Sequence, residues 1–255
     1  EGDVDSSRFA IIGSGDGISA SMSGSTLEVS VPADHVAGNA GSVRVLVDDG
    51  KGGTVEGDVP IVVVSSSLPL VQTSEAQVTL DAGKSTSVDV TQYATNPFAP
   101  QGKLTLVGQP EVSSGGSASA SGTSIHLEAD AGYSGSFTVT YKLADATNDP
   151  GRDVQGTIVA TVRDKPGTPT NATVSSNGPG TAQVSWTSGA SNGTPITNFK
   201  VTDHTQGDSI NCGQVSTCLF SGRTNGIEHT FTVTATNETG ESDPSNSATT
   251  VIDIS

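Results

Sequence analysis

The two cysteines are the residues of this chain whose spacing most clearly suggests chemistry. Cys212 and Cys218 lie in the stretch NCGQVSTC, and the sequence on both sides of it reads as extended. Two cysteines this close predict a disulfide across the end of a β-hairpin, and a stable disulfide implies an oxidising compartment. The alternative is a redox or metal site. That reading would need a CxxC spacing or a second pair of ligands nearby, and the sequence has neither.

A run of acidic residues is the best candidate for metal binding. Asp48 and Asp49 begin the run DDGKGG, and Asp58 follows soon after it. Calcium prefers clustered carboxylate oxygens, so these three residues are the candidate ligands. Their spacing is not that of an EF-hand, however, and the same run is typical of a hairpin turn because Gly and Asp tolerate positive φ. We therefore expect no cofactor and interpret the run as a turn, with calcium binding as the alternative.

The histidines do not form a catalytic or metal-binding motif. None belongs to HExxH, none has a second His or a Cys at ligand spacing, and no GxSxG motif is present. The four residues are His35, His126, His204 and His229. We expect structural roles for His126, which lies in an alternating run, and for His229, which begins another. The sequence predicts no catalytic residue and a protein that is not an enzyme.

The charge of the chain limits the classes of partner. The formal net charge is −16, and acidic residues outnumber basic ones in each third of the chain. Such a chain lacks the basic surface that nucleic acids and anionic bilayers attract. It also shows no transmembrane run and no signal peptide. We expect no nucleic-acid binding, no direct membrane insertion and a monomer. For an oxidised chain, the missing leader suggests a piece of a longer exported protein.

The elements that position these residues are predicted to be β-strands. The 255 residues include 31 glycines and 12 prolines, and no stretch keeps the apolar period of a helix. Instead, runs such as 229–235 alternate between apolar residues and threonine, which is typical of a strand with one buried face. A second extended run, 247–254, follows the turn 237–240 and completes a hairpin. We predict an all-β fold of tandem immunoglobulin-like β-sandwiches that form an elongated rod.

Two proline-containing stretches, 65–69 and 164–169, follow strong apolar runs and are typical of links between β-domains. They predict three domains at residues 1–67, 68–165 and 166–255. Because both links are short, neighbouring domains should keep a restricted mutual orientation.

The first two segments repeat each other. Residues 23–49 and 121–145 share a Ser-Gly turn, an alternating strand, a glycine-containing loop and a second alternating strand. The second segment has two more strands in front, 77–80 and 86–90, so we expect about seven strands in it and about five in the first. We therefore predict that the first domain is N-terminally truncated, with an incomplete sandwich. The stretch SVRVLVDDGKGGTVEGDVPIVVV resembles bacterial immunoglobulin-like and cadherin-like repeats of surface proteins.

The last segment resembles a fibronectin type III domain. It has a linker proline (Pro169), a tryptophan in the strand TAQVSWT, the strand PITNFKVT and the pattern A-x-N-x-x-G-x-S-x-x-S near its end. The resemblance implies core positions for Trp186, Phe199 and Phe231. It extends to fibronectin type III surface proteins of actinobacteria of the bifidobacterial type. Where the family has a leucine and the corner tyrosine, this chain has Arg223 and His229, so we expect a weaker corner.

The resemblance implies binding through loops on a rigid sandwich, and the loops 188–194 and 237–243 are the candidates. Paired domains of this kind in cytokine receptors bind ligands at the elbow between them. We expect an extracellular or cell-surface bacterial protein whose partner is a protein, including a host extracellular protein, so that its function is adhesion or capture. The alternatives are a structural stalk and an accessory module of a secreted glycosidase. The predicted binding residues are Ser188, Asn192, Arg223, His229, Asn237, Glu238, Glu241 and Asp243.

Overall fold

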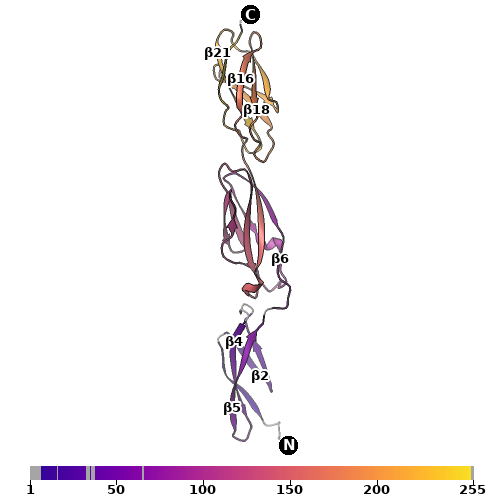
Figure 1. Cartoon of the computed structure of the whole chain (residues 1–255). Helices are drawn as coiled ribbons and strands as arrows, with labels where there is room; N and C mark the ends of the chain where they lie inside the picture. The colour runs from indigo at the N-terminus through magenta and orange to yellow at the C-terminus, as the bar shows by residue number, and fades with distance from the viewer. Residues whose placement is uncertain (1–6, 16, 33–34, 36–37, 65, 254–255) are drawn as a thin grey trace.

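The computed structural model of the chain describes residues 7–15, 17–32, 35, 38–64 and 66–253. They fold almost entirely as β-strands, with short 3-10 turns at Val90–Tyr93 (η2) and Pro150–Arg152 (η3). The strands form three groups that follow one another along an elongated molecule (Figure 1). We call these groups the N-terminal, middle and C-terminal units. The expectation of an all-β rod of immunoglobulin-like sandwiches is confirmed.

The N-terminal unit has two small sheets and little core. One sheet has the order β1-β4-β5, and the other is the hairpin β2-β3. The buried side chains between them are Ile18, Val43 and Val45. The strands are β1 (Arg8–Ser14), β2 (Ser19–Ser23), β3 (Thr26–Ser30), β4 (Gly38–Asp48) and β5 (Thr54–Val63).

The middle unit is a fuller sandwich. One sheet has the order β10-β14-β15-β7, with β11 also paired to β14, and the facing sheet has the order β12-β13-β8. Strand β7 runs parallel to β15, whereas the other strand pairs of the unit are antiparallel. The strands are β6 (Gln72–Thr73), β7 (Ala76–Asp81), β8 (Ser85–Asp89), β9 (Ala94–Thr95), β10 (Thr105–Leu106), β11 (Glu111–Val112), β12 (Gly116–Ser121), β13 (Ser124–Ala129), β14 (Gly135–Ala144) and β15 (Val154–Arg163).

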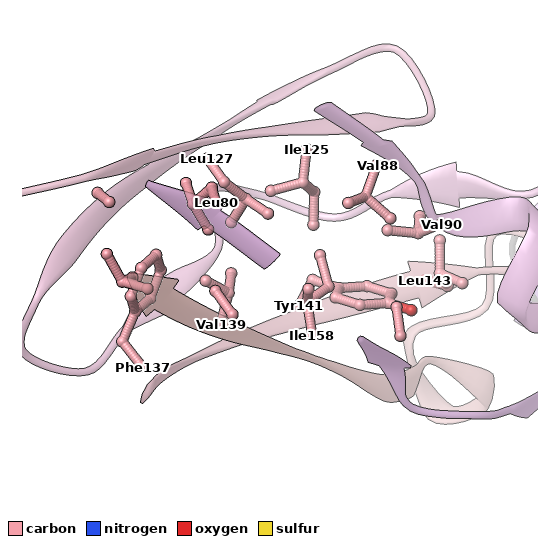
Figure 2. Close-up of a cluster of buried hydrophobic side chains, with 14 of the residues drawn as sticks. Leu80, Val88, Val90, Ile125, Leu127, Phe137, Val139, Tyr141, Leu143 and Ile158 are labelled. Atoms are coloured by element: carbon pink, nitrogen blue, oxygen red, sulfur yellow. The ribbon is translucent and has the colours of Figure 1, made fainter. Parts of the chain in front are cut away.

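The core of the middle unit lies between its two sheets. Figure 2 shows Ile125 and Leu127 of one sheet facing Val139 and Tyr141 of the other, and all four are buried. The structure has more strands here than the seven expected from alternation. Four of the unit's ten strands have only two residues each, which is too short to produce an alternating pattern.

The C-terminal unit has a three-stranded sheet, β16-β17-β20, packed on a four-stranded sheet, β19-β18-β21-β22. Trp186 and Phe199 are buried between the sheets with their ring centroids 5.4 Å apart, and Phe231 is fully buried in the same core with its ring 6.1 Å from that of Phe220. The strands are β16 (Thr170–Ser176), β17 (Thr181–Thr187), β18 (Asn198–Asp203), β19 (Asp208–Gly213), β20 (Thr217–Ser221), β21 (Glu228–Thr236) and β22 (Ala248–Val251).

The predicted final hairpin exists, although its second strand is shorter than expected. Strand β21 pairs antiparallel with β22, which ends at Val251, and Ile254 of the expected run lies outside the described residues. A long connection joins the two strands. The hydroxyls of Ser242 and Ser245 accept hydrogen bonds from the backbone N–H of Ala235 and Val233. The two serines of the sequence pattern therefore provide hydrogen-bond acceptors for backbone N–H groups of β21 that β22 does not pair.

Candidate functional site

The loop that begins at Asn237 lies against the link between the middle and C-terminal units. The side-chain amide of Asn237 donates hydrogen bonds to the carbonyl oxygens of Asp164 (2.8 Å) and Ser191 (3.0 Å). Its Oδ1 accepts hydrogen bonds from the backbone N–H groups of Thr239 (2.9 Å) and Gly240 (3.1 Å). The side chain is buried, and both ends of its amide are used. Asn237 therefore joins its own turn, the linker and the neighbouring loop.

The second loop contacts the same link. The backbone carbonyl of Asn192 accepts a hydrogen bond from the N–H of Asp164 (2.9 Å), and its Nδ2 donates to the carbonyl of Lys165 (2.8 Å). Gly193 has φ of 89°, and a Cβ on it would lie 3.3 Å from the carbonyl oxygen of Val162. The loop is therefore packed closely against the end of β15, where a larger side chain would be strained.

Two ion pairs lie at the same junction. Arg163, at the end of β15, contacts Glu238 (Nη1–Oε2 3.1 Å) and also Asp81 of β7 (Nη2–Oδ1 2.9 Å). Lys165 in the linker contacts Asp243 (Nζ–Oδ1 2.9 Å). Glu238 and Asp243 are largely exposed, so solvent screens these pairs and they contribute more to orientation than to stability.

These contacts change the interpretation of four predicted binding residues. Asn192, Asn237, Glu238 and Asp243 contact the link or the middle unit within this chain. Asn192 and Asn237 use their side-chain amides in these contacts and are poorly placed to bind an outside partner, whereas Glu238 and Asp243 remain largely exposed. The sequence identified both loops but gave no sign of what they face, since the contacting residues are far apart along the chain.

Two of the predicted binding residues stay at the surface. Ser188 is exposed, and its hydroxyl donates to the carbonyl of Gly189. Glu241 pairs with Lys200 of β18 (Oε1–Nζ 2.6 Å) and accepts a hydrogen bond from Thr234. The lysine contact holds the pKa of Glu241 below its usual value. The structure does not bring Ser188 and Glu241 into one cluster.

Arg223 and His229 lie inside the C-terminal unit, which contradicts their predicted role in binding a partner. The guanidinium of Arg223 contacts Asp203 (Nη1–Oδ2 2.6 Å) and forms two bonds to Asp208 (2.6 Å each). Its CZ atom lies 3.9 Å from the ring centroid of Phe220. The side chain of Arg223 is 3% exposed, so a partner cannot reach it.

His229 completes this buried network. Its Nδ1 lies 2.7 Å from Asp203 Oδ2, and its Nε2 lies 2.9 Å from the carbonyl oxygen of Thr224. Both partners of the ring, a carboxylate and a carbonyl oxygen, are hydrogen-bond acceptors. The imidazole is fully buried and links β21 to the end of β18 and to the preceding loop. The corner therefore has two polar links in place of the single hydroxyl of a tyrosine.

Asp203 is the acidic centre of this network, and it is not among the residues that the sequence predicts to be functional. Burial by itself raises the pKa of Asp203, but hydrogen bonds from Arg223, His229 and the backbone N–H of Thr205 and Gln206 outweigh it and hold the pKa below its usual value. A signal was available: Phe199, Val201 and Asp203 alternate along β18, which places the carboxylate on the buried face.

The link between the N-terminal and middle units has its own buried arginine. Arg152 donates to the carbonyl oxygens of Ser66 (3.0 Å) and Pro69 (2.9 Å), and its Nε contacts Asp145 Oδ2 (2.7 Å). Burial alone raises the pKa of Asp145, but hydrogen bonds from Thr147 and Arg152 hold it below its usual value. Arg152 therefore ties the linker to the end of the middle unit, and nothing in its sequence context predicted this.

The disulfide is present, but it does not close a hairpin. Cys212 and Cys218 are bonded, with their Cα atoms 5.9 Å apart. Cys212 is in β19 and Cys218 in β20, and these strands belong to opposite sheets. The bond therefore joins the two sheets where the chain crosses between them. The expected hairpin position is wrong, because alternation identifies strands but not the sheet that each one joins.

The structure does not bring the three candidate calcium ligands together. Asp58 forms a two-bond ion pair with Arg44 (2.9 and 3.1 Å), which holds its pKa below the usual value. Asp48 accepts a hydrogen bond from the N–H of Gly50, and Asp49 accepts from Lys51 and Gly53, as expected for a turn. Within the described ranges, no three acidic, histidine or cysteine side chains lie close enough to hold a metal ion.

The fold and this set of buried contacts define a class of protein: an array of immunoglobulin-like β-sandwiches joined by short polar links. Within it, a family model described as the fibronectin type III domain matches residues 167–251. Residues 167–251 are therefore a fibronectin type III domain, as the sequence patterns predicted. Such domains generally take part in protein–protein interaction or act as spacers, and they are typically non-catalytic.

Comparison with solved structures found domains of titin and other chains. Domains A168–A170 of titin are 16% identical with a TM-score of 0.41, over 97% of this chain and 88% of that one. Titin kinase with its flanking domains is 25% identical with a TM-score of 0.30, over 34% of this chain and 17% of that one. A structure described as "FN3tt mut" is 16% identical with a TM-score of 0.30, over 35% of this chain and 98% of that one.

At these scores the similarities carry no inference about function. The search of curated proteins found no match. None of the helices in the described part of the chain has the length and apolar character needed to cross a membrane.

Proposed function

We propose that this chain is an extracellular spacer that holds its fibronectin type III domain in a fixed orientation relative to the middle unit. The observation that carries the proposal is the buried side chain of Asn237, which bonds the linker and the neighbouring loop at once. In our proposal the three units are separate domains, with boundaries at 67/68 and 165/166. The three separate clusters of buried side chains support this division.

The disposition of exposed apolar residues also favours a spacer over a binding module at this elbow. The exposed large apolar side chains of the C-terminal unit are Val215, Leu219, Ile227 and Val251. Ile227 and Val251 lie next to each other at the end away from the link, whereas the junction itself carries charged pairs. A partner-binding elbow would need an apolar patch of several hundred Å². The disulfide supports an extracellular location, because such bonds persist in oxidising compartments.

The proposal predicts a narrow distribution of distances across the junction. Spin labels carried by non-natural amino acids at exposed Glu128 and Thr249 would report it by pulsed electron resonance without disturbing the disulfide. We expect a narrow distribution for the wild type and a broad one for Asn237→Ala, which removes the central hydrogen bonds. Glu241→Gln is the matched control, because Glu241 lies in the same loop but bonds only within its own unit. A broad distribution in the wild type would rule out the spacer.

A further inference from the structure

Strand β20 forms an open edge of the C-terminal unit. It pairs with β17 on one side, and among the described residues no strand pairs with its other side. The opposite side of the sandwich is closed, because β16 lies against β22 and the side-chain amide of Asn246 bonds both the N–H and the carbonyl of Ala172 (3.0 Å each). The first and last strands of the fibronectin type III domain, β16 and β22, therefore lie away from β20.

The register of the β17–β20 ladder shows which backbone groups of β20 face outward. The N–H of Trp186 donates to the carbonyl oxygen of Ser216 (3.0 Å), the residue just before β20. Because hydrogen-bonded pairs alternate along an antiparallel ladder, Cys218 and Phe220 also bond β17, and the residues between them turn their backbone groups away from it. These outward residues are Thr217, Leu219 and Ser221. Among the described residues, only Arg223 contacts one of their outward groups: its Nε donates to the Ser221 carbonyl (3.3 Å).

The sheet that ends in this edge is uncharged. Strands β16, β17 and β20 contain no Asp, Glu, Lys, Arg or His, although the chain has a net charge of −16. The charged residues nearest to β20 along the chain, Asp208 and Arg223, bond each other (2.6 Å). Edge strands are usually protected by a charge, a proline or a bulge, and β20 has none of these. A second copy of this acidic chain can therefore approach β20 without meeting like charges on the sheet.

We propose that β20 pairs with β20 of a second copy of this chain, antiparallel and about a two-fold axis at Leu219. In this register Leu219 lies opposite Leu219 of the second copy, and Thr217 lies opposite Ser221. The outward N–H and C=O groups of all three residues gain partners, and two three-stranded sheets become one continuous sheet. Leu219 is 52% exposed in the single chain, and its counterpart covers it. Because both copies use the same edge, the contact closes at two copies and does not propagate into fibres.

The lack of charge on the sheet favours a second copy over a charged segment of a different polypeptide. Such a segment would find no countercharge on β16, β17 or β20, so its charged groups would lose hydration without compensation. The proposal departs from the monomer that we expected from the sequence. It does not depend on the spacer function, because the shared edge lies outside the junction with the middle unit.

The pairing also determines the shape of the dimer. The strands of the C-terminal unit run roughly along the long axis of the rod (Figure 1). Antiparallel pairing of β20 therefore makes the two rods extend in opposite directions from a shared central sheet. Small-angle X-ray scattering should accordingly show a dimer that is much longer than the single chain.

The first test measures the mass and the amide exchange of the full chain. By analytical ultracentrifugation we expect the mean mass to rise reversibly with concentration, from that of one chain toward twice that value. Over the same range, hydrogen exchange followed by NMR should slow at the N–H groups of Thr217 and Leu219. It should change less at Phe220, whose N–H already bonds β17.

Charge variants at the two-fold axis test the register. Leu219→Lys places two lysines opposite each other and should weaken the dimer at least about fivefold, because like charges across strands are destabilising. Leu219→Glu should weaken it similarly, and an equal mixture of the two variants should form a mixed dimer. Thr173→Lys is the matched control: it adds the same charge to the exposed face of β16 in the same sheet and should leave the dimer unchanged. The fluorescence of Trp186 shows whether each variant folds.

Several results would overturn the proposal. One is a chain that stays monomeric at every concentration, and another is a dimer in which the amides of Thr217 and Leu219 exchange as fast as in the monomer. Equal weakening by Leu219→Lys and Thr173→Lys, or a mixture of the two charge variants that stays monomeric, would also contradict it. If the chain alone stayed monomeric and an added peptide of alternating threonine and valine protected these amides, the occupant would be an outside segment instead.

Discussion

Replacing Arg223 by methionine should destabilise the C-terminal unit by about 3–5 kcal/mol, the cost of removing one partner from a buried ion pair. The Asp203 side chain is fully buried, and Arg223 is the one arginine or lysine among the described residues that contacts it. Methionine keeps much of the packing over Phe220 but leaves the carboxylate facing only the imidazole of His229 and backbone N–H groups. The network loses its strongest donor while Asp203 stays out of reach of solvent.

The single tryptophan provides a selective assay. Trp186 lies in the core of the C-terminal unit, so its fluorescence in urea follows the unfolding of that unit alone. Asp208→Asn is the control, because Asp208 bonds the same guanidinium with a half-exposed side chain and should cost much less. If Arg223→Met lost no more stability than Asp208→Asn, the buried pair would not stabilise the unit and this reasoning would be refuted.

The pH dependence of the same variant gives an independent check. In the wild type the pKa of Asp203 is lowered from 3.8, so the stability that it confers is complete above that value and is lost as the pH falls through the folded-state pKa. Without Arg223 the pKa of the buried carboxyl should rise, and protonation should then relieve the unpaired charge. The difference between variant and wild type should therefore shrink from about pH 7 to about pH 4. A difference that grew on acidification would contradict this account.

Three further predictions concern the links and the disulfide. Asn237→Ala should cost the C-terminal unit about 1–3 kcal/mol in urea unfolding, because it leaves buried backbone groups unpaired; a neutral result would show that water replaces the amide. Arg152→Ala should destabilise the middle unit by about 3–5 kcal/mol in calorimetry and speed hydrogen exchange in the first linker, since buried Asp145 loses its cation. Unchanged exchange there would contradict the contact with the linker. Reduction of the Cys212–Cys218 bond should cost about 2 kcal/mol by chain entropy, measured by tryptophan fluorescence, with a Cys→Ser double variant behaving like the reduced protein.

The sequence predicted the strands well wherever a strand has one buried face and one exposed face. The alternation around Phe231 and the resemblance that implied a core position for Trp186 both proved correct. The sequence did not predict contacts between segments that are far apart along the chain. The partner of Asn237 is Asp164, 73 residues away, and a loop sequence carries no record of the surface that it meets. The sheet membership of Cys212 and Cys218 was missed for the same reason.

Polar residues in the interior were the second source of error. Arg223 and His229 were recognised as departures from the family, and both were predicted to bind a partner, although a structural role was also expected for His229 and is confirmed by its burial. Asp203 compensates both of them, and it is the third member of an inward-facing alternation. An acidic residue at such a position, together with two unexpected basic residues, is the pattern that would have predicted a buried network.

The parallel pairing of β7 with β15 determines how a rod of this kind responds to tension. Strand β7 follows the first linker and β15 leads into the second, so a pull on the two ends of the middle unit slides these strands past each other. Their six residue pairs end with Arg163 and Asp81, whose side chains also form an ion pair. All six pairs are then loaded together in shear and do not open one after another. The N-terminal unit has no such parallel pair in its described part, and its strands pair only antiparallel. Under force the N-terminal unit should extend first, while the middle unit and its junction with the fibronectin type III domain keep their length.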